Sequence, residues 1–158
     1  MIILINGSIN SGKTTIAKLL WDTFEKSAVI EVDEIRNFIS STDLKKSIPI
    51  NLENTVSLTK NFISHNYHVI ILYPLFESNK EYMQNAFSKL ETDFTIFSLA
   101  PSLEIALQNR GSRELDDWEL DRIKYHYKIG ISKLSDSIII DNSNQTPEET
   151  VSTILEKL

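Results

Sequence analysis

The stretch GSINSGKT, residues 7–14, combines residue types that bind phosphate groups. It has a glycine, four further residues, a second glycine, a lysine and a hydroxyl residue, in that order. Gly7 and Gly12 permit backbone conformations and close approaches that a side chain would block, so successive amide hydrogens can point at one anion. Lys13 adds a positive charge, and the hydroxyl of Thr14 can bind Mg²⁺. The spacing therefore predicts a site for the triphosphate of a nucleotide.

Such a loop needs a strand before it and a helix after it, and the flanking sequence predicts both. Residues 2–5 are continuously apolar, and residues 14–26 place Ile16, Leu20 and Phe24 on one side of a helix. The start of this helix would direct unpaired amides and its positive dipole end at the same anion. A glycine- and serine-rich turn that contains a lysine by chance is the alternative, and the strand–loop–helix context argues against it. The predicted phosphate-binding residues are Gly7, Ser8, Asn10, Ser11, Gly12, Lys13, Thr14 and Thr15.

A second group of charged residues, in the sequence VIEVDEIR, ends the next apolar segment. In open α/β sheets, ligands bind at the carboxyl ends of the strands. Phosphoryl transfer to a hydroxyl needs a carboxylate that orients the nucleophile and accepts its proton, and a cation that holds the acceptor; Asp33 and Arg36 fit these roles. Asp33 shares a face with Glu31 if the strand continues, and with Arg36 if a helix begins there. The alternative is that Asp33 only caps a helix and that Arg36 is a surface residue.

Three of the four arginines lie within residues 110–122, and we expect this segment to be a lid. Guanidinium groups on such a segment can neutralise the charge that develops on a transferring phosphoryl group and can exclude water. We assign this role to Arg110 and Arg113. For Arg122, a lid role and a surface ion pair with one of the neighbouring acids both remain open.

Other conspicuous side chains are assigned to structure. We expect Trp118 and Tyr125 to be packing residues rather than surfaces on which a base stacks. The histidines His65, His68 and His126 have no metal-ligand spacing, so we expect them to be structural or exposed.

Composition limits the classes of function. The chain has 158 residues, 41% of them hydrophobic, and a net charge of −6. This suits one domain with a core, and it disfavours broad contacts with nucleic acid or an anionic membrane. There is no cysteine, and no apolar run is long enough to span a bilayer. Residues 1–5 have no basic flank and form too short an apolar run for a signal peptide. We expect a soluble cytoplasmic protein with a small-molecule partner.

Apolar segments alternate with helical patterns along the chain. The apolar segments are near-continuous, which is typical of strands buried on both faces of a parallel sheet. The alternation predicts one three-layer α/β domain over residues 1–158, with right-handed crossovers. Residues 40–49 are the least regular and are predicted to be a loop over a substrate. The predicted strands are 2–5, 28–32, 68–73, 93–99 and 137–140, and the predicted helices are 14–26, 52–64, 77–90, 103–110, 117–129 and 147–158.

Together these residues resemble the small P-loop kinases, a group that includes the shikimate and gluconate kinases, chloramphenicol phosphotransferase, and the kinase domains of zeta toxins and polynucleotide kinases. GSINSGKT resembles their phosphate loop, DEIR (33–36) their aspartate–arginine pair and RGSR (110–113) their arginine-bearing lid. The resemblance spans almost the whole chain. It implies a five-stranded parallel sheet of order 2-3-1-4-5 with helices on both faces, and phosphorylation that uses ATP and Mg²⁺. It also implies that Arg110 contacts the nucleotide and that Asn142 and Pro147 border the adenine.

The sequence departs from that group after the third predicted strand. Many P-loop proteins have an acidic magnesium-shell residue there, whereas this chain has YPLF and no carboxylate before Glu77. Glu31 or Asp33 is then the candidate to contact the metal through water, which competes with the role of Asp33 as a base. YPLF also replaces the glycine-rich turn with which shikimate kinases hold their acid substrate.

The number of arginines bears on the acceptor. Kinases of nucleoside monophosphates surround the acceptor phosphate with arginines, because bidentate guanidinium contacts offset its charge. Residues 33–76 contain one arginine, Arg36. We therefore expect the segment of about residues 33–60 to bind a sugar acid, a cyclitol acid or an antibiotic-like molecule through a hydroxyl and at most one anionic group.

Other functions and assembly states remain open at this stage. A kinase of nucleoside monophosphates or nucleic-acid ends is one alternative, and a regulatory switch that hydrolyses nucleotide slowly is another. The Asn-Lys-x-Asp guanine reader of many switches does not occur in the sequence. A monomer and a homodimer both fit.

Overall fold

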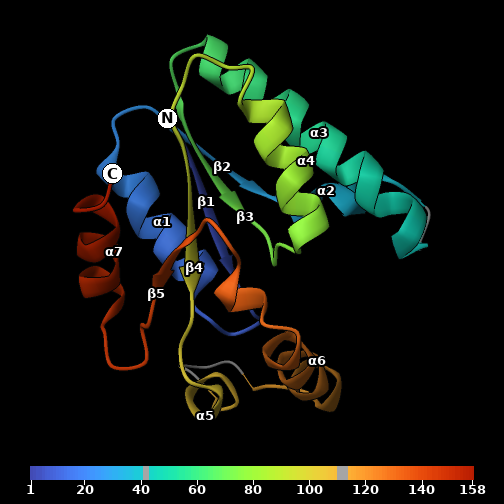
Figure 1. Cartoon of the computed structure of the whole chain (residues 1–158), viewed down its shortest axis with the longest axis vertical. Helices are drawn as coiled ribbons and strands as arrows, with labels where there is room; N and C mark the ends of the chain where they lie inside the picture. Colours follow the sequence, from blue (N-terminus) through green and yellow to red (C-terminus); the bar gives the residue numbers. More distant parts are fainter. Residues whose placement is uncertain (41–42, 110–113) are drawn as a thin grey trace.

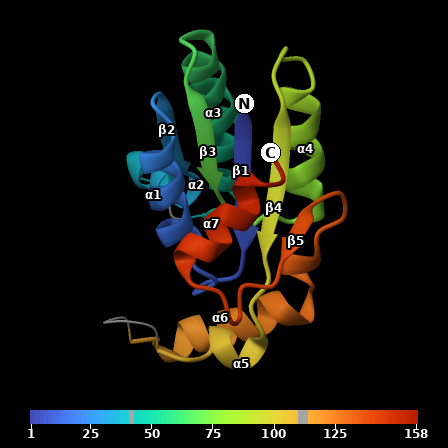
Figure 2. The same cartoon turned by 90° about the vertical axis from the view of Figure 1, so that its left-hand side faces the viewer.

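The computed structural model describes residues 1–40, 43–109 and 114–158, and it contains a five-stranded sheet between two layers of helices (Figures 1 and 2). All paired strands are parallel, and their order is β2-β3-β1-β4-β5. This confirms the three-layer α/β fold and the strand order that the resemblance implied.

Most elements lie within a few residues of their predicted bounds. The strands are β1 (Ile2–Gly7), β2 (Ser27–Glu31), β3 (His68–Leu72), β4 (Phe94–Leu99) and β5 (Ile138–Ile140). The helices are α1 (Lys13–Thr23), α2 (Val32–Ile35), α3 (Leu44–Ser64), α4 (Glu77–Phe87), α5 (Leu103–Ala106), α6 (Asp117–Lys128) and α7 (Pro147–Leu155). Two 3₁₀ turns, η1 (Arg36–Phe38) and η2 (Ile131–Lys133), follow α2 and α6.

The central strands supply two hydrophobic cores, one on each face of the sheet. Successive side chains of a strand point to opposite faces, so Ile2 and Leu4 of β1 enter one core while Ile3 and Ile5 enter the other. The first core is closed by side chains of α2, α3 and α4, and the second by side chains of α1 and α7. Both faces of the sheet are therefore covered, which explains the near-continuous apolar sequence of its strands.

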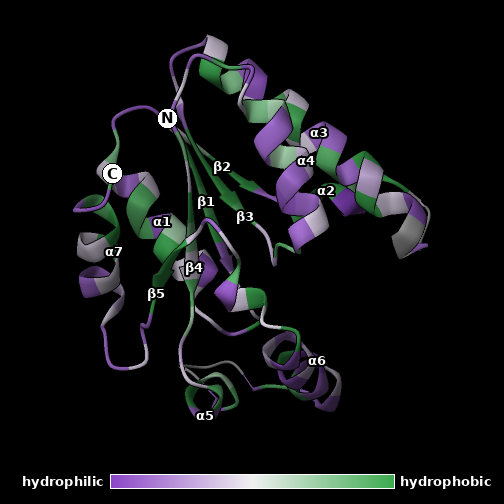
Figure 3. Ribbon diagram, viewed as in Figure 1, coloured by the Kyte–Doolittle hydropathy of each residue, from purple (hydrophilic) through white to green (hydrophobic). Residues whose placement is uncertain are grey.

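Hydropathy distinguishes the strands from helix α6. The strands are hydrophobic along most of their length, whereas α6 is mainly hydrophilic (Figure 3). Helices α5 and α6 lie beyond the carboxyl ends of the strands (Figure 1). In the part of the chain that the structure describes, no helix is long and apolar enough to span a membrane.

Helix α3 is the main departure from the predicted elements, because it begins at Leu44 and includes Pro49. Residues 44–49 are helical, so the prediction of a loop over residues 40–49 is wrong for that part. A proline inside a helix removes a backbone hydrogen bond and costs about 3 kcal/mol. Burial offsets this cost, since Leu52 and Val56 lie in the core and Ile48 packs against it, and each fully buried aliphatic side chain contributes about 1.5–3 kcal/mol.

Asn6 connects the end of β1 to three other segments, and its side chain is fully buried. Its Nδ2 donates to Ser98 Oγ at 2.9 Å and to the Ile131 carbonyl at 2.7 Å. Its Oδ1 accepts from the amide of Leu75 at 2.8 Å. Since Gly7 follows directly, these bonds fix the start of the phosphate loop relative to β4, η2 and the connection after β3.

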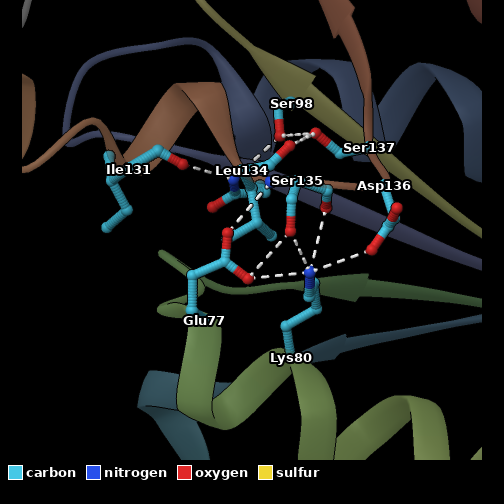
Figure 4. Close-up of polar contacts among 9 residues, drawn as sticks. Glu77, Lys80, Ser98, Ile131, Leu134, Ser135, Asp136 and Ser137 are labelled. Carbon is cyan, nitrogen blue, oxygen red and sulfur yellow. Dashed lines mark hydrogen bonds and ion pairs between the residues drawn. The ribbon is translucent and has the colours of Figure 1, made fainter.

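Lys80 joins α4 to the turn before β5 (Figure 4). Its side chain is 4% exposed, and its Nζ lies 2.7 Å from Glu77 Oε2 and 3.3 Å from Asp136 Oδ2. The same ammonium donates to the carbonyl and the hydroxyl of Ser135. The hydrogen bond from Lys80 lowers the pKa of Glu77. The first carboxylate after β3 is thus used in a structural ion pair.

Candidate active site

The phosphate loop connects β1 to α1, and its backbone has positive φ at Gly7 (148°), Asn10 (60°) and Gly12 (98°). A Cβ atom at Gly7 would lie 2.5 Å from Ser11 Oγ and 2.9 Å from the Leu99 carbonyl oxygen. Real Cβ atoms are not found that close to a backbone oxygen, so this position requires glycine for both space and conformation. The first glycine of the predicted motif therefore has a specific packing role.

Lys13 begins α1 and folds back over the loop. Its Nζ donates to the carbonyl of Gly7 at 2.9 Å and to that of Ser8 at 2.7 Å. Thr14 and Thr15 follow in the first turn of α1 and line the same pocket as Lys13. The first turn of a helix also has amides without intrahelical partners. An ammonium, hydroxyls and the amides at a helix N-terminus in one place suit phosphate oxygens and a hydrated Mg²⁺.

Two further side chains connect the loop to helices outside the sheet. Ser8 Oγ lies 3.1 Å from Nδ1 of His126 in α6. Asn10 Nδ2 donates to the carbonyls of Ala106 and Gln108, both at 2.9 Å, at the end of α5. The loop is therefore bonded to both helices that flank the predicted lid.

Asp33 and Arg36 follow β2 in a helical arrangement. Helix α2 begins at Val32, so Asp33 lies in its first turn and Arg36 begins η1. Of the two arrangements that the sequence left open, the helical one is present. The capping position of α2 is Glu31, which makes no side-chain capping bond, so Asp33 is not an N-cap. Glu31, Asp33 and Arg36 all line the pocket that contains Lys13.

Charges from both sides of the pocket act on these carboxylates. Burial raises the pKa of Asp33, and the charges of Lys13 and Arg36 oppose that rise without cancelling it. Burial and the charge of Glu34 raise the pKa of Glu31, which Lys13 again opposes. An aspartate with a raised pKa is a better proton acceptor than an ordinary one. The pocket therefore contains a carboxylate of raised pKa beside the phosphate loop.

Helix α6 contributes four pocket residues: Glu119, and three that are spaced by four, Trp118, Arg122 and His126. This spacing places them on one face of the helix. His126 is buried, and its ring forms an edge-to-face pair with that of Phe76, with the ring centroids 6.4 Å apart. The guanidinium of Arg122 lies 5.2 Å from the ring centroid of Tyr125. Trp118 is 67% exposed, so the prediction that it is a packing residue is wrong.

His126 is neutral at pH 7. Burial lowers its pKa to about 4, and the charges of Arg122 and Lys13 act in the same direction. Its Nε2 is buried and has no hydrogen-bond partner among the described residues. The prediction that His126 is structural or exposed missed its position against Ser8 in the pocket.

The connection after β3 supplies aromatic residues in place of an acid. Tyr73, Pro74 and Phe76 line the pocket, whereas Glu77 is held by Lys80 (Figure 4). Burial and the charge of Asp33 raise the pKa of Tyr73 to about 12, so its phenol stays protonated.

The segment before α7 closes another side of the pocket. Asn142 is buried, and its Nδ2 donates to the carbonyl of Ser11 at 3.0 Å. Pro147 is the first residue of α7, and Thr146 and Glu149 on either side of it form a capping box. Asn142 therefore supports the phosphate loop directly, and its contact with an adenine stays a prediction.

All these groups surround one pocket of about 880 Å³, a size that suits small-molecule ligands. Gly7 and Ser8 are buried and are not among the residues that line it. Arg110 and Arg113 lie outside the described residues. The predicted site residues that line the pocket are Asn10, Ser11, Gly12, Lys13, Thr14, Thr15, Glu31, Asp33, Arg36, Asn142 and Pro147.

Sequence reasoning missed His126 and Trp118 as pocket residues and left Arg122 undecided. The signal was present in the four-residue spacing of the three side chains on a predicted helix. What was lacking was the knowledge that this face of α6 turns toward the phosphate loop.

No protein-family model matches the chain, and no curated protein matches its sequence. Solved structures do match. A sugar kinase from Janibacter sp. is 18% identical with a TM-score of 0.72, covering 98% of this chain and 92% of its own. A thymidylate kinase from Candida albicans is 17% identical with a TM-score of 0.70, covering 99% and 89%. A shikimate kinase from Aquifex aeolicus is 22% identical with a TM-score of 0.61, covering 99% and 95%. The chain has the fold of the small P-loop kinases.

Proposed function

We propose that the protein is an ATP-dependent phosphotransferase that moves the γ-phosphate to a hydroxyl of a small molecule. The observation that carries this proposal is one pocket in which the phosphate loop faces Asp33, Arg36 and Arg122. Two guanidinium groups in the same pocket as the loop and a carboxylate offer contacts for an acceptor as well as for the nucleotide. Similarity to solved sugar and shikimate kinases supports the same class of reaction.

The loop residues fit ATP with Mg²⁺. When bound, ATP supplies the phosphoryl group and Mg²⁺ offsets its charge. We assign Lys13 to the phosphates and Thr14 to the metal, with Glu31 or Asp33 reaching the metal through water. Among the described residues, no three His, Cys, Asp or Glu side chains gather into a metal site. A metal held mainly by phosphates and water needs only one or two protein oxygens.

Asp33 is the proposed base. Its carboxylate would accept the proton of the acceptor hydroxyl as that oxygen attacks the phosphorus, and its raised pKa suits this task. Arg36 and Arg122 would hold one anionic group of the acceptor, since guanidinium groups pair well with carboxylates. This supports a sugar acid, a cyclitol acid or an antibiotic-like alcohol. The lid role of Arg110 and Arg113 rests on the sequence alone.

The test is ADP release with ATP and Mg²⁺ across a panel of hydroxylated metabolites and nucleoside monophosphates. We expect at least one alcohol to stimulate release and to gain one phosphate per ADP. Lys13→Ala should lower kcat by about 10²–10³-fold, because an electrostatic contact to the transferring group is lost. Asp33→Asn should bind ATP as tightly as the wild type and lose transfer by about 10²–10⁴-fold. Asp22→Asn, an exposed change on α1 outside the pocket, is the control.

Each contrary result has a separate meaning. Background hydrolysis alone across the panel would contradict the kinase proposal and favour a regulatory switch. Turnover only with nucleoside monophosphates would contradict the acceptor class. Normal turnover in Asp33→Asn would remove Asp33 as the base and leave it as a candidate for the magnesium shell.

A further inference from the structure

Trp118 is a large apolar side chain at the edge of a polar pocket. It lies in the first turn of α6, lines the pocket and is 67% exposed. Tryptophan is costly to expose, and aromatic side chains at binding surfaces provide rigid contact area with little loss of conformational entropy. Unlike Trp21, which is also exposed, Trp118 lies where a ligand group in the pocket can cover it.

The order of residues along α6 shows where that group would lie. His126 meets the phosphate loop through Ser8. Arg122, one turn away, lines the same pocket as Asp33 and Tyr73. Trp118 is a further turn out, about 6 Å beyond Arg122 at 1.5 Å per residue.

Neighbouring groups make this outer region suitable for a flat ring. The guanidinium of Arg122 lies over the ring of Tyr125, and Arg122 and Trp118 both line the pocket. Ile48 and Phe76 add apolar lining to the same pocket. A single-ring sugar acid with its hydroxyl at Asp33 and its carboxylate at Arg122 would leave Trp118 uncovered.

We infer that the acceptor joins a hydroxylated part, held at Asp33 and Arg122, to an aromatic ring that stacks on Trp118. This inference rests on the proposed phosphotransferase function. Two kinds of molecule share this chemistry: an aryl glycoside, whose ring is an aglycone, and a nucleoside, whose ring is a base. Stacking on an aromatic side chain predicts about tenfold tighter binding than for the same molecule without the ring.

The experiment compares matched pairs of compounds in the presence of a non-hydrolysable ATP analogue and Mg²⁺. In the first pair, phenyl β-D-glucuronide carries an aromatic ring where methyl β-D-glucuronide carries a methyl group. In the second pair, uridine carries a base where methyl β-D-riboside carries a methoxy group. A Trp21→Phe variant leaves Trp118 as the single tryptophan, since the chain has two. We expect the aromatic member of at least one pair to change the Trp118 emission saturably and to bind about tenfold more tightly by calorimetry. The pair that responds identifies the kind of acceptor.

Trp118→Leu should lower the affinity ratio within the responding pair to about one. Trp21→Leu is the matched control and should keep the ratio, because Trp21 is 52% exposed on α1 outside the pocket. Three results would each overturn the inference. The two members of each pair could bind with equal affinity, neither aromatic member could bind at millimolar concentration, or the affinity ratio could stay unchanged in Trp118→Leu. Preferential binding through Trp118 without ADP release from any acceptor would instead overturn the phosphotransferase function.

Discussion

At the scale of single residues, Gly7 offers a direct test of the phosphate-loop geometry. Gly7→Ala should destabilise the fold by about 3 kcal/mol, because its Cβ would overlap the Leu99 carbonyl and Ser11 Oγ. Gly130→Ala is the matched control: φ is also positive there, at 70°, but no atom lies within 4 Å of the added Cβ, so the cost should be about 1–2 kcal/mol. Urea unfolding measures both. Equal losses would show that overlap at Gly7 is unimportant.

His126 should make stability depend on pH. Its folded-state pKa is about 4, below the unfolded value of about 6.5, so the unfolded chain binds more protons between these values. Stability is therefore complete above pH 6.5 and falls as pH drops toward 4, by about 3 kcal/mol at most. His126→Gln cannot gain the charge, so its unfolding free energy should vary less across this range.

The control for this experiment is His65→Gln, since His65 is exposed just after α3. This variant should keep the wild-type dependence on pH in urea unfolding at pH 4.5, 5.5 and 6.5. A wild-type slope in His126→Gln would show that other groups cause the loss of stability at low pH.

The role of a residue could be predicted from the sequence where local backbone geometry determines it. Lys13 and Thr14 follow from the motif, because the loop geometry that places them is encoded locally by its glycines and the adjoining helix. Trp118 and His126 do not, because helical periodicity shows which residues share a face but not what that face meets. Only the packing of α6 beyond the strand ends decides this.

At the scale of elements, Lys80 should stabilise the contact between α4 and the turn before β5. Lys80→Met keeps most of the buried stem and removes the charge that bonds Glu77, Ser135 and Asp136 (Figure 4). We expect a loss of about 1.5–3 kcal/mol, as for hydrogen bonds to charged groups.

The matched control is Lys124→Met in α6, which breaks an ion pair with Asp121 at the same i,i+3 spacing. This pair is on the surface, since the side chain of Lys124 is 58% exposed and that of Asp121 is 82% exposed. Such a surface pair contributes no more than about 0.5 kcal/mol. Thermal unfolding of both variants provides the comparison. A loss in Lys124→Met as large as that in Lys80→Met would mean that burial of the lysine adds nothing.

Elements were predictable where one local signal dominates. The five strands follow from near-continuous apolar runs, and α7 follows from Pro147 and the acids after it, which the capping box confirms. The start of α3 was not predictable, because Pro49 argues locally against a helix. Burial of Leu52 and Val56 against the sheet decides the outcome there, and that contact is made only in the folded chain.

At the scale of the whole molecule, the phosphate loop is a point where separate parts of the fold meet. Through Asn6 its start is fixed to β4, η2 and the connection after β3. Through Ser8 and Asn10 it is bonded to α6 and α5. Asn142, from the far end of the chain, supports it as well. A ligand on the loop therefore stabilises contacts from much of the sequence.

This arrangement predicts a large thermal shift with nucleotide. At 100 times its Kd, an ATP analogue with Mg²⁺ should add about 2.7 kcal/mol, which raises Tm by about 5–10 °C for a chain of this size. Chelation of Mg²⁺ with EDTA should reduce the shift, since the metal offsets phosphate charge. Lys13→Ala should abolish most of it, while Lys18→Ala, an exposed change on the same helix outside the pocket, should keep it. An undiminished shift in Lys13→Ala would show that the nucleotide binds somewhere other than the loop. Asp33 would then have no phosphoryl donor beside it, which would contradict its proposed role as a base.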